Sequence, residues 1–302
     1  MDLSTEAAEN PFQVLIDKAD NDPTELQHLY ETHRTNRNNQ QRDKILSETF
    51  PGWSIDDILA RLDGPGKEAG FVDPRNCLVI WARPPPAVRE VIRFVQAELK
   101  SVAPALWLMP LENLHTTVLE VAHSRTEEEI EDLVKTLQSS TDVTPSQIAS
   151  YPTSHPSHLV KPMVSFDSSA LALSFVPAAG EGTSAGASDE YSYHHLRGDI
   201  WDMVQRAGLP VASRYVVPSA HLTIARFISQ SGFTEEDEVD RLRVKSFVDK
   251  IEQINRKLEE TYWPRENGAT VPGGGEWDVG REELVIRRGR VWYGGGEDVP
   301  LD

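Results

Sequence analysis

The chain repeats one order of elements twice: a strand, a helix, a strand with a His-x-Thr motif, and a second helix. Apolar runs indicate the strands, and apolar residues at helical spacing indicate the helices. The first copy spans residues 76–82, 83–101, 115–122 and 124–140. The second copy spans residues 169–177, 191–208, 220–227 and 234–263. This duplication predicts two α+β lobes that face each other, each sheet backed by its helices.

The two strand-borne motifs place their polar residues on one face. Side chains two residues apart in a strand point to the same side, so His115 projects with Thr117 and His221 with Thr223. The intervening and flanking residues are mostly apolar and would face the core. If a pseudo-two-fold axis relates the lobes, both pairs converge on one central cleft.

Two imidazoles and two hydroxyls around one point suit a phosphodiester. One imidazole can act as general base and the other as general acid near neutral pH. Threonine hydroxyls can bind the non-bridging phosphoryl oxygens, and no metal ion is required. Each motif could instead satisfy only its own buried hydrogen bonds, but the matching positions of the two motifs favour a shared site.

A third match, from His33 to Thr35, shows what chance produces. It lies in ETHRTNRNNQ, a polar segment of helical character with no apolar strand after it. We therefore assign no site to this match.

Composition limits the partners. The net charge of −18 disfavours DNA, long RNA and anionic membranes, but it leaves room for a small anionic ligand. No secretory signal or membrane-spanning run is evident, which predicts a cytoplasmic or nuclear protein. Cys77, the single cysteine, cannot form an intrachain disulfide and is expected to be buried.

Three segments together resemble a known family: CLVIWARPPPAVREVIRFVQAEL, LWLMPLENLHTTVLEV and PSAHLTIARF. They resemble the 2H (two-histidine) phosphoesterase superfamily, in particular 2′-5′ RNA ligase and cyclic nucleotide phosphodiesterase proteins. The whole chain is most similar to fungal members with a helical N-terminal extension, here residues 1–70. The resemblance covers about residues 75–295 and implies a bilobal fold of two pseudo-symmetric antiparallel-sheet lobes, about 75–165 and 166–295, with helices outside.

The resemblance also implies a function. His115 and His221 would be the catalytic pair, and Thr117 and Thr223 would bind phosphate. The expected activity is metal-independent and cofactor-free hydrolysis of a 2′,3′-cyclic phosphate or a related small RNA-derived phosphodiester. Which histidine is the acid and which the base stays open, as do the phosphate product, the oligomeric state and any protein partner.

Two other functions stay open. The cleft could bind a nucleotide or RNA end without catalysis while the helical N-terminus recruits a partner protein. It could also join 2′-5′ RNA ends, although the acidic charge disfavours holding two RNA strands. Two intact titrating motifs favour the hydrolase.

Several further residues could contribute. Arg214 and Tyr215, just before the second motif, and Tyr193, on the preceding helix, could contact the substrate through charge and stacking. One of the adjacent His194 and His195 could also face the cleft. The remaining features have ordinary structural interpretations: His155 and His158 without a third metal ligand, glycine runs 273–275 and 294–296 as turns, and Trp81 and Trp107 as core residues.

Overall fold

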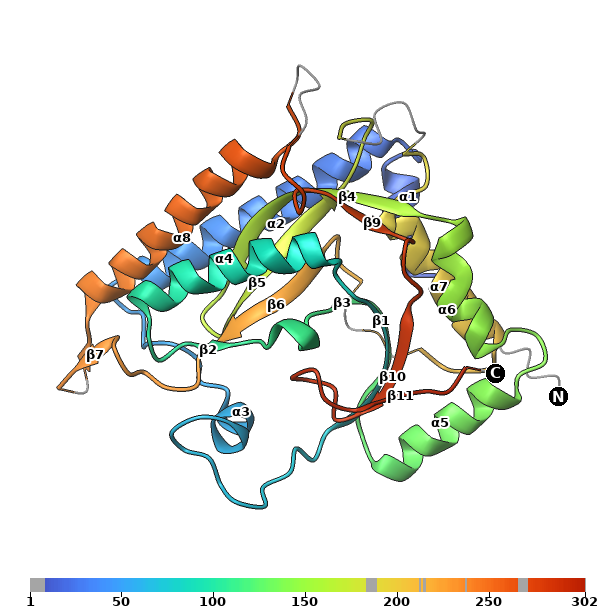
Figure 1. Cartoon of the computed structure of the whole chain (residues 1–302), viewed down its shortest axis with the longest axis horizontal. Coiled ribbons are helices and arrows are strands. Elements are labelled where there is room, and N and C mark those ends of the chain that lie inside the picture. The colour runs from blue at the N-terminus through green and yellow to red at the C-terminus, as the bar shows by residue number, and fades with distance from the viewer. Residues whose placement is uncertain are drawn as a thin grey trace.

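The computed structural model describes residues 9–182, 189–211, 213, 216–236, 238–265 and 271–301. It is an α+β protein built on one curled antiparallel sheet (Figure 1). The strand order is β11-β10-β1-β3-β6-β5-β4-β9, and β2 pairs with β6. The sheet strands are β1 Asn76–Ala82, β2 Trp107–Leu108, β3 Thr116–Arg125, β4 Ser157–Phe166, β5 Ala170–Pro177, β6 Ala220–Arg226, β9 Trp277–Val279, β10 Val285–Gly289 and β11 Glu297–Asp298.

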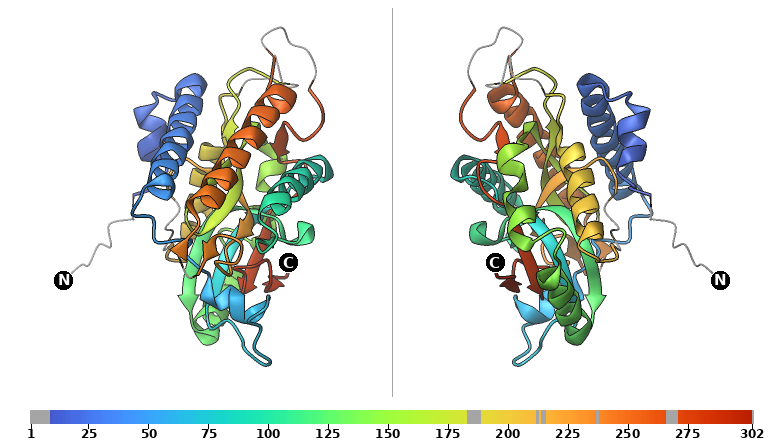
Figure 2. Two further views of the ribbon diagram at one scale, coloured as in Figure 1. Left: turned by 90° about the vertical axis from the view of Figure 1, so that its left-hand side faces the viewer. Right: turned by 90° about the vertical axis from the view of Figure 1, so that its right-hand side faces the viewer.

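Helices cover the sheet and its edges. They are α1 Gln13–Lys18, α2 Pro23–Leu46, α3 Asp57–Leu62, α4 Pro86–Val102, α5 Glu127–Ser139, α6 Pro145–Ser154, α7 Tyr193–Arg206 and α8 Arg241–Tyr262, with a 3-10 turn at Leu111–Asn113. Helix α8 contacts both α2 and α4, and these three helices pack against strands β4, β5 and β6 (Figure 2). Helices α5 and α7 pack against β3.

All eight elements of the predicted repeat are present. The first copy forms β1, α4, β3 and α5, and the second forms β5, α7, β6 and α8. Helix α5 begins with the capping box between Thr126 and Glu129. Helix α8 begins at Arg241, later than the expected residue 234, because Thr234–Glu235 and Glu238–Val239 form a small hairpin, β7–β8, and the Asp240 side chain then caps the helix.

The sheet does not divide as the sequence suggested. The two lobes were expected to carry separate sheets, but β3 and β6 pair at Thr116 and Leu222, so the sheet is continuous. The strand partners also cross the expected boundary near residue 165. Strand β4 pairs with β5, and β10, from the C-terminal region, pairs with β1. Strand pairing depends on long-range contacts, which the linear order of elements does not specify.

The N-terminal helical segment shares the core of the sheet. Its residues Phe12, Tyr30 and Trp53 belong to the main hydrophobic cluster. Trp53 stacks on Phe227, which directly follows β6, with ring centroids 4.0 Å apart. Residues 9–70 contain helices α1, α2 and α3 and pack as part of the same body as the sheet. Among the described residues, no helix combines the length and apolar character needed to cross a membrane.

Candidate functional site

The fold brings the two His-x-Thr motifs together at the centre of the sheet. Thr116 on β3 lies opposite Leu222 on β6. Both residues are buried, and so are their apolar neighbours on the same face. Continuing this antiparallel register places His115 beside Thr223 and Thr117 beside His221. The four predicted site residues therefore face one space, as an alternating strand pattern requires.

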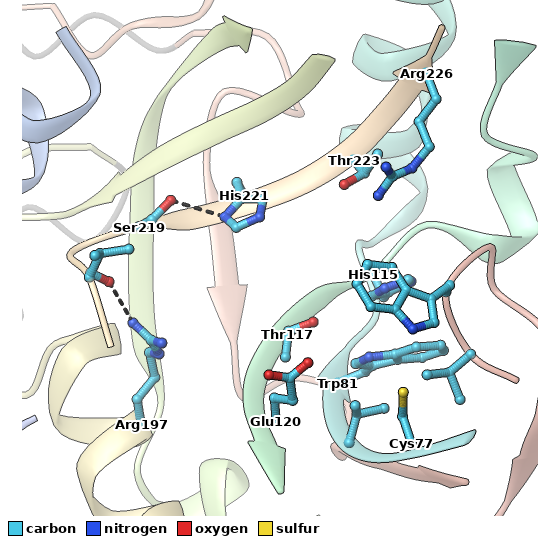
Figure 3. Close-up of a pocket in the computed structure, with 14 residues that line it drawn as sticks. Cys77, Trp81, His115, Thr117, Glu120, Arg197, Ser219, His221, Thr223 and Arg226 are labelled. Carbon is cyan, nitrogen blue, oxygen red and sulfur yellow. Dashed lines mark hydrogen bonds between the residues drawn. The ribbon is translucent and has the colours of Figure 1, made fainter. Parts of the chain in front are cut away.

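A single cavity contains all four residues (Figure 3). Strands β1, β3 and β6, helix α7 and the segment after β10 contribute to its wall. The lining residues are Cys77, Val79, Trp81, His115, Thr117, Glu120, Arg197, Val217, Ser219, His221, Thr223, Arg226, Val291 and Trp292.

His115 is held by the backbone and by an aromatic ring. Its Nδ1 lies 2.8 Å from the carbonyl oxygen of Asn113, which can only accept, so Nδ1 carries the proton. The neutral ring then presents Nε2 as its acceptor. The imidazole stacks on Trp81 with centroids 3.6 Å apart and an interplanar angle of 13°. Trp81 is buried, as expected, but it also forms one side of the site.

The loop after β10 supports this arrangement. Gly294 has a φ of +84°, and a Cβ on it would lie 2.2 Å from the Cβ of Asn113. Glycine thus allows the loop to pack directly on the residue whose carbonyl orients His115. Asn113 also donates its side-chain amide to the carbonyl of Tyr293, 3.0 Å away.

His221 has different neighbours. Its Nδ1 lies 3.0 Å from the Ser219 hydroxyl, which can donate or accept. Burial, together with the positive charge of Arg197, lowers the pKa of His221 to about 4. Burial likewise lowers the pKa of His115 to about 3; the Asn113 carbonyl opposes this shift and nearby Arg83 adds to it. Both imidazoles are therefore neutral near pH 7 in the empty site.

Two arginines to which sequence reasoning gave no role flank the motifs. Arg197, on α7, is 1% exposed. Its Nε donates to the carbonyl of Val118 on β3 at 3.2 Å, and its Nη1 donates to the carbonyl of Val217 before β6 at 2.9 Å. Arg197 thus connects β3 to the segment that leads into β6 and places a cation at the cavity wall. Its sequence environment is an ordinary amphipathic helix, so no local signal marked it.

Arg226 ends β6 on the other side of the cavity. Its guanidinium lies 3.4 Å from the Asp56 carboxylate, which caps α3 and also accepts from the Tyr293 hydroxyl at 2.7 Å. The N-terminal segment therefore supplies a carboxylate that holds a cavity-lining arginine. This contact joins residues 170 positions apart, which the sequence pattern could not reveal.

Tyr193, a further predicted contact residue, does not line the cavity. Tyr193 is fully buried, and its hydroxyl donates to the carbonyl of Thr117 at 3.2 Å, so it supports β3 from the core side and is not part of the cavity wall. Arg214 and Tyr215 lie outside the described residues.

The adjacent histidines on α7 are structural. His194 is fully buried between the Tyr30 hydroxyl at 2.8 Å and the Phe12 carbonyl at 3.1 Å. His195 completes the N-terminal capping box of α7, and its Nε2 donates to Asn21 at 2.7 Å. Neither ring lines the cavity, so the possibility that one of them faces the cleft is not realised.

The remaining histidine candidates also lie apart from the cavity. The third His-x-Thr match lies within α2, where residues two apart point in different directions. His155 stacks on Tyr151, and His158 lies 3.4 Å from Glu276. The described residues include no group of three or more histidine, cysteine or acidic side chains placed to hold a metal ion.

A scan against models of known protein families finds none that matches this chain, and a search of curated proteins finds no match either.

Proposed function

We propose that this protein is a phosphodiesterase of the two-histidine type that hydrolyses a 2′,3′-cyclic phosphate or a related small phosphodiester without a metal ion. The observation that carries the proposal is the pairing of β3 with β6 at Thr116 and Leu222, together with the presence of His115, Thr117, His221 and Thr223 in one cavity. On this proposal, the two halves of the sheet are the two pseudo-symmetric lobes of a 2H fold, joined at β3 and β6.

In the proposed reaction, one imidazole acts as the general base and the other as the general acid. One neutral imidazole removes a proton from water while the water oxygen forms a bond to phosphorus. The bond from phosphorus to one ribose oxygen breaks, and the other imidazole, in its protonated form, gives its proton to that oxygen. Exchange with solvent restores the starting protonation states. Thr117 and Thr223 donate to the non-bridging oxygens as their negative charge develops.

The lowered pKa values fit this sequence of steps if the negative charge of the bound substrate lets one imidazole take up a proton from solvent. An anionic phosphate near a neutral imidazole favours the charged form of the ring and raises its pKa. Arg197 and Arg226 attract the same anion into a cavity of an otherwise acidic protein. The acidic overall charge favours a small substrate over a long RNA strand.

Hydrolysis of the four nucleoside 2′,3′-cyclic phosphates, measured with EDTA present, tests the proposal. We expect turnover in the wild type and its loss in both His115→Ala and His221→Ala, with chromatography separating 2′- from 3′-phosphate products. Thermal melts would verify that both variants are folded.

Other results would favour the alternatives. Equal nucleotide affinity in the wild type and in a variant without both histidines, with no turnover in either, would favour a binding module. Formation of 2′-5′ linkages between RNA ends would favour end-joining. Turnover unchanged in either variant would refute the paired-histidine mechanism.

A further inference from the structure

The cavity extends beyond the two motifs along β1 and β3. Trp81 lies opposite Thr117, and Val79 lies opposite Glu120. The β1 partners of Thr117 and Glu120 are two residues apart, which corresponds to about 7 Å along a strand. The cavity therefore has one end at the histidines and another at Glu120 (Figure 3).

A bulge in β3 turns Glu120 into the cavity. Ile80 pairs with Leu119, but its neighbour Trp81 pairs with Thr117, so Val118 is the extra residue. Val118 and Leu119 both join the main core. Strict alternation after Thr117 would have directed Leu119 into the cavity and Glu120 into the core. The bulge reverses this, which is why sequence reasoning missed Glu120.

The wall between the two ends is apolar and aromatic. Cys77, Val79, Trp81 and Val291 form a cluster separate from the main core, and Trp292 packs against it. Such a surface favours a flat, weakly polar group over a charged one. Cys77 is buried, as expected, and contributes to this wall.

Glu120 places a carboxylate at this end of the cavity, whereas Arg197 and Arg226 place positive charge near the histidines. Glu120 is only 5% exposed and lines the cavity, so a second phosphate there would meet an electrostatic penalty. A carboxylate offers two oxygens with about four acceptor sites, so it can accept from a ligand and from the protein at once. The best ligand edge presents two adjacent N–H donors to the two oxygens.

We propose that this end of the cavity is a base subsite that selects guanine, an inference that rests on the proposed function. Guanine presents N1–H and an exocyclic amine side by side on its Watson–Crick edge. Adenine and cytosine place an acceptor next to their amine, and uracil flanks its one N–H with two carbonyls. Those acceptors would face the Glu120 carboxylate, whereas the ring of any base could lie on the apolar wall.

The test compares kcat/KM for guanosine and adenosine 2′,3′-cyclic phosphates in the wild type, Glu120→Gln and Glu131→Gln. We expect the wild type to prefer guanosine by about 10- to 100-fold, because site groups left unpaired by the wrong base oppose its binding. Glu120→Gln, which replaces one acceptor oxygen with a donor, should reduce this ratio to about threefold or less. Glu131 lies on α5, outside the cavity, and pairs with Arg288, so its variant should keep the wild-type ratio.

Binding separates a failure of the subsite from a failure of the proposed reaction. If no cyclic phosphate is hydrolysed, calorimetry with 3′-GMP and 3′-AMP still measures base selection, and the same ratio and the same loss in Glu120→Gln are expected. A preference for another base would overturn the inference. So would an equal loss for both nucleotides in Glu120→Gln, because Glu120 would then support the catalytic centre and not read the base.

Discussion

The two His-x-Thr motifs share one strand geometry but differ in what holds each imidazole. His115 donates to a backbone carbonyl and stacks on Trp81. His221 contacts a serine hydroxyl, and the positive charge of Arg197 helps to lower its pKa. The backbone acceptor fixes one tautomer of His115, whereas the hydroxyl of Ser219 can serve either protonation state of Nδ1. A duplicated motif therefore sets which face the histidines occupy, and the surrounding fold makes the two rings chemically unequal.

The largest expected effect tests whether these unequal rings act as one unit. We expect His115→Asn and His221→Asn each to lower kcat by about 10²- to 10⁴-fold, the range of general acid–base catalysis. The kcat of the double variant should be only slightly lower than that of the less active single variant, because the effects of removing residues that act in one step are strongly non-additive. Single-turnover hydrolysis of a cyclic nucleotide measures all three. Losses that multiply in the double variant would mean that the two histidines contribute independently.

Removal of Arg197 should affect the second motif more than the first. In Arg197→Met the carbonyls of Val118 and Val217 lose their donor, and we expect the free energy of unfolding to fall by about 2–4 kcal/mol. The pKa of His221 should rise toward its ordinary value, since Arg197 is the strongest positive charge that lowers it, with little change at His115.

Urea denaturation and NMR titration of the two histidines measure these effects. Arg206→Met is the matched control, because Arg206 lies on the same helix in a solvent-exposed pair with Asp142 and its removal should leave stability nearly unchanged. Equal shifts of both histidines in Arg197→Met would contradict the separate surroundings inferred here.

The affinity of the two motifs for an anion should depend on pH. The pKa values of about 3 and about 4 leave both free rings neutral near pH 7, whereas a bound tetrahedral anion stabilises a protonated ring. The complex then holds a proton that the free protein lacks, so affinity should rise by up to about tenfold for each unit that pH falls, above the free pKa values.

Sulfate is a suitable probe because it does not titrate in this range. Calorimetry in buffers of different ionisation enthalpy would report uptake of up to about one proton on binding. Replacement of either histidine by asparagine should weaken the pH dependence, and unequal weakening would identify the ring that takes the proton. A sulfate affinity independent of pH in the wild type would contradict this coupling.

Local pattern predicted the strands and helices of the repeat because burial on one face has a period. The alternation around His115 and His221 therefore indicated correctly which side chains share a face. It could not indicate which strands pair, so it predicted neither the continuous sheet nor the pairing of β10 with β1. It also failed where a bulge breaks the period, at Glu120.

Long-range contacts account for the other omissions at the site. Arg197 reaches the cavity from a helix, and Arg226 is held by Asp56 from the N-terminal segment. Trp81 met the expectation of a buried aromatic, but its stacking on His115 depends on the pairing of β1 with β3. Each case needs tertiary geometry, since the residues involved look ordinary in their local sequence.

The smallest expected effect concerns the hydroxyl beside His221. Ser219→Ala removes a neutral hydrogen bond to Nδ1, worth about 1 kcal/mol, so we expect kcat to fall by about three- to tenfold with little change in KM. Ser231→Ala, at an exposed position outside the cavity, is the control. The equivalent support of His115 is the Asn113 carbonyl, which no side-chain substitution removes. A kcat unchanged in Ser219→Ala would mean that the second imidazole is oriented without this hydroxyl, and the contrast between the two motifs would then depend on Arg197 and Trp81 alone.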